Sequence, residues 1–120
     1  MNKKLGEFCK KISRDLIRHD LKLIKYFQYD LRRYIILLKV MENYYLELCQ
    51  TQEQMLESIP SHLSSRSNLL NIINHCYSEN YFDKIRIQDN LRAKTIHPSP
   101  LLEAQFKQWI TILHKDYAPL

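Results

Sequence analysis

The chain has 120 residues, a formal net charge of +5, three cysteines and one glycine. This length is close to the commonest size of one domain, and the scarcity of glycine favours a mainly helical fold. The longest purely apolar run, residues 35–38, excludes a membrane span, and three cysteines without a CxxC pair exclude a disulfide framework. We expect a soluble, single-domain protein of a reducing, cytoplasmic compartment, with no membrane partner.

Positive charge is concentrated near the N-terminus. Residues 1–39 hold eleven Lys and Arg against four Asp and Glu, whereas residues 40–63 hold four acidic residues and no Lys or Arg. Such a segment is compatible with nucleic acid or with an anionic membrane surface, and charge alone does not choose between them. A solvated helix face explains it equally well.

Two amphipathic helices are predicted in the first 50 residues. Apolar residues at three- and four-residue spacing indicate one helix from residue 4 to about residue 27. Asp30 is a plausible N-cap for a second helix. Its predicted inward face consists of Leu31, Tyr34, Ile35, Leu38, Met41, Tyr45 and Leu48.

A pair of shorter helices should follow. Thr51 and Gln54 have the spacing of a capping box, which predicts a helix that ends near Pro60. A further helix is predicted at Arg66–Ser78 and should end near Asn80, because asparagine tolerates the left-handed conformation that closes helices. The expected inward residues of the two helices are Met55, Leu56, Ile59, Leu69, Ile72, Ile73 and Cys76.

The spacing of apolar residues then changes. Residues 82–87 and 91–97 are predicted to form a β-hairpin with a polar tip at residues 88–90. Ser99 should cap a last helix that has Pro100 at its first position. The apolar residues of this helix are Leu101, Leu102, Phe106, Trp109, Ile110 and Leu113.

Helix, short helix, turn, helix, hairpin and helix is the order of a winged helix-turn-helix. We therefore expect a mainly α fold with a small β-hairpin wing, flanked by N- and C-terminal helices. Within one domain of residues 1–120, residues 1–50 would contribute to dimerisation, residues 51–99 would form the winged helix-turn-helix, and residues 100–120 would form the C-terminal helix.

Residues 65–99 resemble the DNA-binding region of the MarR family of bacterial transcriptional regulators, including its Sar-type branch. The string Asn-Tyr-Phe-Asp-Lys at residues 80–84 is similar to the Sar-type entry to the wing, and residues 90–99 match the family's wing without gaps. On this register Arg92 occupies the position of the wing arginine, Lys94 that of the following base, and Ser99 that of the threonine that caps the next helix.

The resemblance implies a homodimer that binds an inverted repeat of double-stranded DNA through its recognition helix and wing. Family members dimerise through their first and last helices, which here would use the apolar face of residues 5–17 and that of residues 106–113, with Trp109 as an anchor. The alternative is that both faces close the core of the monomer itself.

The candidate DNA-binding residues can also be assigned from their chemistry, without the family resemblance. Small polar side chains in the first turn of a helix suit phosphates and base edges, arginine pairs with guanine, and asparagine pairs with adenine. Basic residues around a hairpin neutralise phosphates or enter a narrow minor groove. The candidates are Ser65, Arg66, Ser67, Asn68, Asn71, Asn74, Arg86, Arg92 and Lys94.

Other functions find little support in the sequence. Arg92 and His97 have a spacing found in helical ribonucleases, but Pro98 argues against a helix there, and no catalytic motif, metal-ligand spacing or cofactor motif occurs. We expect a non-enzymatic protein without cofactor or metal, with its cysteines buried, although Cys9 could also be a redox-sensitive thiol. The competing hypothesis is a helical adaptor whose degenerate winged helix binds protein, which Leu91 at a wing arginine position would favour.

Overall fold

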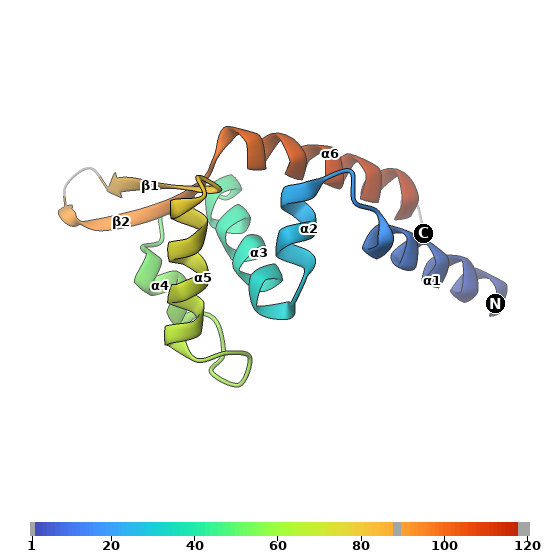
Figure 1. Cartoon of the computed structure of the whole chain (residues 1–120), viewed down its shortest axis with the longest axis horizontal. Helices are drawn as coiled ribbons and strands as arrows, with labels where there is room; N and C mark the ends of the chain where they lie inside the picture. Colours follow the sequence, from blue (N-terminus) through green and yellow to red (C-terminus); the bar gives the residue numbers. More distant parts are fainter. Residues whose placement is uncertain (1, 88–89, 118–120) are drawn as a thin grey trace.

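The computed structural model describes residues 2–87 and 90–117, together with the side chains of these residues except 87, 90–93, 116 and 117. The elements in this part of the chain are α1 (Asn2–Ile17), α2 (Lys22–Gln28), α3 (Leu31–Tyr45), α4 (Gln52–Glu57), α5 (Arg66–Ser78), β1 (Phe82–Ile87), β2 (Asn90–Pro98) and α6 (Pro100–Tyr117). In Figure 1, α5 and the hairpin lie at one end of the molecule, α6 runs above α2 and α3, and α1 projects at the other end. The expected mainly helical fold with a small antiparallel hairpin is confirmed.

A single apolar cluster joins every element except α1, which contributes no buried residue to it. At its centre Phe27 of α2 stacks on Phe82 of β1, with ring centroids 5.5 Å apart. The last helix closes the cluster from above with Leu102, Phe106 and Trp109. The core thus holds the hairpin and α5 in a fixed relation to α2, α3 and α6.

The helix predicted over residues 4–27 is wrong in one respect, because the chain breaks between α1 and α2. Arg18 forms a two-bond ion pair with Asp20 inside the break. The ammonium of Lys25 donates to the carbonyl oxygens of Asp15 and Leu16, which the end of α1 leaves without helical partners. The break turns α2 so that its own apolar residues reach the core.

The predicted inward face of α3 is also wrong for most of its members. Met41 is buried and Tyr34 and Ile35 pack half-buried against the core, but the other four of the seven are exposed. The buried apolar residues of α3 are Ile36, Leu37, Val40 and Met41. The continuous apolar run at residues 35–38 fits more than one helical stripe, so its periodicity does not choose between them. The contacts of α3 with α2, α5 and β2 decide which stripe is buried.

The predicted helix ends are confirmed at four places. Asp30 accepts from the backbone N–H of Arg33 at 2.9 Å, and Thr51 and Gln54 form the reciprocal capping box. Asn80 closes the turn after α5 with φ of 61°. Ser99 accepts from the backbone N–H of Leu102, and α6 begins at Pro100. These capping signals depend on a few neighbouring residues, so they can be predicted without the tertiary structure.

Candidate nucleic-acid interface

Helices α4 and α5 form a pair joined by residues 58–65. Leu69, Ile73 and Cys76 of α5 are buried, which fixes one face of this helix against the core. The hydroxyl of Tyr77 donates to the side-chain oxygen of Gln52 at 2.9 Å and so ties α5 to the start of α4. Burial raises the pKa of Tyr77, which keeps this hydroxyl protonated as a donor. The opposite face of α5 is left to solvent.

The first turn of α5 is ordered by its own polar side chains. The Ser65 hydroxyl accepts from the backbone N–H of Asn68 at 3.3 Å and lies 3.5 Å from the hydroxyl of Ser67. The guanidinium of Arg66 forms an ion pair with the carboxylate of Glu53 on α4. The predicted residues at this turn are therefore brought together, and Arg66 is held toward α4.

On the outer face of α5, four polar residues that the sequence predicts to contact DNA are exposed. Asn71 lies four residues after Ser67 and three after Asn68, and Asn74 three after Asn71, so the four positions lie on one side of the helix. They are Ser67, Asn68, Asn71 and Asn74.

Basic residues gather on one face of the hairpin. Arg86 of β1 lies directly across from Lys94 of β2, and Lys84 lies two residues before Arg86 on the same face. At the base of that face the Lys84 ammonium lies 4.5 Å from the ring centroid of Tyr77. We call Lys84, Arg86 and Lys94 the hairpin basic face. Like charges directly opposite each other destabilise a sheet, so this face is suited to an anionic partner.

The opposite face of the hairpin is anchored to α3. The side-chain nitrogen of Asn43 donates to the hydroxyl of Thr95 at 3.0 Å, and its oxygen accepts from the backbone N–H of Gln50 at 2.9 Å. The ring of His97 lies against Tyr44, with centroids 5.1 Å apart. These contacts leave the hairpin basic face on the side of α5.

The sequence missed Lys84 as a site residue, although its period-two spacing to Arg86 in a predicted strand was a usable signal. It also overlooked Asn43, for which a lone asparagine in a helical pattern offers no signal. The side chain of Arg92 lies outside the described residues, and its backbone belongs to β2. The structure thus brings Arg86 and Lys94 together and leaves the position of the Arg92 guanidinium undescribed.

Two expectations about individual side chains are wrong. Phe106 and Trp109 are 8% and 3% exposed, so they pack inside the chain instead of anchoring a partner. Cys9 and Cys49 are exposed, and only Cys76 is buried. Burial raises the pKa of Cys76 to about 12, so its thiol stays protonated.

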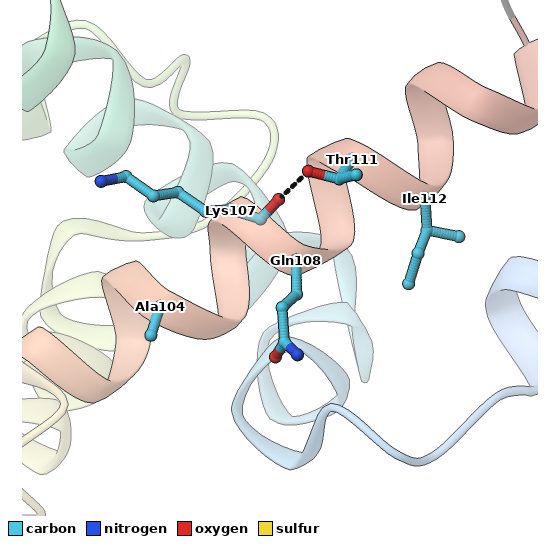
Figure 2. A pocket seen from close by; sticks show the side chains of 5 residues that line it. All are labelled: Ala104, Lys107, Gln108, Thr111 and Ile112. Atoms are coloured by element: carbon cyan, nitrogen blue, oxygen red, sulfur yellow. Dashed lines mark hydrogen bonds between the residues drawn. The ribbon is translucent and has the colours of Figure 1, made fainter.

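The remaining features considered are a hollow on α6, possible metal ligands and possible membrane-spanning helices. Figure 2 shows a hollow of about 400 Å³ lined by α6 alone, where the Thr111 hydroxyl donates to the carbonyl oxygen of Lys107 at 2.9 Å. In the part of the chain that the structure describes, no three His, Cys, Asp or Glu side chains are placed to hold a metal ion. None of the helices there combines the length and apolar content that crossing a bilayer requires.

The chain matches no known protein family, no curated protein and no solved structure.

Proposed function

We propose that this protein is a sequence-specific transcriptional regulator that binds double-stranded DNA as a winged helix-turn-helix. The observation that supports it most is the hairpin basic face beside a helix whose outer side is wholly polar. In this arrangement α5 enters the major groove, and the hairpin follows the neighbouring backbone and minor groove.

Each side chain then has a distinct role. Asn68 and Asn71 pair with adenine edges, while Arg66 leaves Glu53 to pair with guanine. Ser65, Ser67 and Asn74 contact phosphates and hold the helix in register. The hairpin basic face neutralises phosphates, and Arg92 enters the minor groove.

The same proposal includes a homodimer on an inverted repeat of DNA, acting in the bacterial cytoplasm. Since Trp109 is buried, we assign the contact between copies to an exposed apolar surface where α6 passes the end of α3. Tyr45 and Ile110 are exposed there and line a hollow of about 500 Å³ together with Phe106. A two-fold contact through this surface would place two copies of α5 on one duplex.

Fluorescence anisotropy with labelled genomic duplexes, titrated across a range of salt concentrations, tests the proposal. We expect the slope of log affinity against log salt to fall by about one for each basic residue removed in Arg86→Ala and Lys94→Ala. Lys115→Ala on the exposed end of α6 is the control and should leave the slope unchanged. An absence of duplex binding at low salt would contradict the proposal.

One observation favours the second candidate function, a helical adaptor that binds protein. Tyr45 and Ile110 line one hollow, and Leu46 and Leu48, which follow Tyr45 in the chain, are also exposed. Contiguous exposed apolar residues mark protein interfaces. This function predicts retention of a protein partner that is lost in Ile110→Asp, and no response to DNA at any salt concentration.

A further inference from the structure

Helix α1 carries an apolar stripe that is exposed among the residues that the structure describes. Leu5, Cys9, Ile12 and Leu16 recur at spacings of four, three and four residues and therefore share one side of the helix. Leu5 is 61% exposed, Ile12 is 40% exposed and Leu16 is 56% exposed. We call these four residues the α1 stripe. Surface of this kind gains free energy when it leaves water.

The polar side of α1 is strongly basic. It carries five Lys and Arg residues against Glu7 and Asp15. Lys4 and Lys11 directly precede members of the α1 stripe and follow one edge of it. Glu7 lies three residues after Lys4 and four before Lys11, so it neighbours both lysines and faces away from the α1 stripe. The basic residues of α1 are Lys3, Lys4, Lys10, Lys11 and Arg14.

Polar contacts hold the last turns of α1 to the body of the molecule. The indole N–H of Trp109 donates to one carboxylate oxygen of Asp15 at 2.9 Å, and the amide of Gln28 donates to the other at 3.2 Å. The Lys25 ammonium caps the carbonyl end. From this attachment α1 projects away from the hairpin end of the molecule (Figure 1).

We propose that α1 is an interfacial helix that binds the surface of an anionic membrane, with the α1 stripe among the acyl chains and its lysines at the headgroups. A narrow apolar side, a strongly basic polar side and a modest share of apolar residues are the properties of helices that lie in this interface. DNA would neutralise the lysines but leave the α1 stripe in water, whereas anionic lipid satisfies both.

A second copy of α1 is a poorer occupant. Pairing two copies would bring together five Lys and Arg from each helix against only Glu7 and Asp15 of each, so the net interaction is repulsive. The carboxylate of Asp15 is already engaged by Trp109. An anionic lipid surface meets the same lysines with opposite charge.

Co-sedimentation of the full-length protein with vesicles tests this inference, which does not depend on DNA binding. The probe is a mixture of phosphatidylserine and phosphatidylcholine, with pure phosphatidylcholine as the neutral comparison. We expect partitioning onto the anionic vesicles that is about tenfold or more stronger than onto neutral ones, and that weakens with salt. Lys4→Glu with Lys11→Glu should abolish the preference.

The α1 stripe is tested by Leu5→Gln with Ile12→Gln, which should lower anionic-vesicle binding about tenfold or more. Leu101→Gln is the matched control, because Leu101 of α6 is also 61% exposed, and it should leave binding unchanged. The thermal midpoint of the double variant should equal that of the parent, since both positions are exposed. Equal binding to both vesicle types, no binding to either, or a double variant that changes only the oligomeric state would overturn the proposal.

Discussion

The guanidinium of Arg66, the first residue of α5, is paired with the carboxylate of Glu53 on α4. Both side chains are about half exposed, at 51% and 58%, so the ion pair is reachable from solvent. If the guanidinium of Arg66 pairs with a guanine, its ion pair with Glu53 must first break. In that case the ion pair with α4 lowers the affinity that the first residue of α5 could contribute.

Substitution Glu53→Gln should tighten DNA binding by up to about fivefold, because an exposed ion pair is worth about 0–1 kcal/mol and the variant no longer holds Arg66 by charge. Anisotropy titration of one labelled duplex measures the change. Glu57→Gln, on the same short helix, is the control for removal of a negative charge alone. An equal effect of the two substitutions would assign no special role to the ion pair.

Asn43→Ala should destabilise the fold by about 1–3 kcal/mol. The Asn43 side chain is 3% exposed and bonds both the Thr95 hydroxyl and the Gln50 backbone, so its loss leaves buried polar groups unsatisfied. Urea unfolding followed by circular dichroism measures the change. Asn74→Ala, at an exposed position of α5, should alter stability by less than about 0.5 kcal/mol. Equal stabilities of the two variants would show that Asn43 does not anchor the hairpin.

The three thiols should differ in reactivity. Cys9 and Cys49 are exposed and should react promptly with a chromogenic disulfide reagent at mildly alkaline pH, whereas Cys76 is buried and should react only after unfolding. The assay counts the thiols released with and without denaturant. Three prompt thiols would mean that α5 does not pack against the core through Cys76.

Alkaline pH should weaken the fold in part through Cys76. Because burial raises its pKa from 9.0 to about 12, the neutral thiol stabilises the folded state fully below pH 9, and this contribution is lost as the pH rises toward 12. Burial likewise raises the pKa of Tyr26 from 10.0 to about 12, which adds a loss that begins at higher pH. Urea midpoints between pH 8 and 10 should fall less steeply for Cys76→Ala than for the parent, and parallel curves would contradict this assignment.

Local signals made one part of the fold predictable. The limits of α5, the capping residues Thr51, Ser65 and Ser99, and the turn at Asn80 all follow from a few neighbouring residues. The hairpin was predictable for a similar reason, because its apolar spacing changes from that of a helix to that of a strand.

Features that depend on distant contacts were not predictable. The break after α1 is stabilised by Lys25 from the next helix, and the buried side of α3 is selected by its neighbours. Trp109 was expected at a dimer interface, but its indole packs inside the chain and bonds Asp15 from the opposite end of the sequence. For the candidate site, the polar face of α5 followed from helical spacing, whereas the cross-strand pairing of Arg86 with Lys94 required the hairpin register.

Selection of bound duplexes from a randomised pool tests the claim that the protein recognises a specific DNA sequence. The full-length protein should enrich one motif, arranged as an inverted repeat with half-sites about one helical turn, or a multiple of it, apart. Asn68→Ala and Arg66→Ala should relax the preference at single positions of that motif, while Lys94→Ala should weaken binding to all sequences alike. A pool that emerges without any enriched motif would contradict the claim.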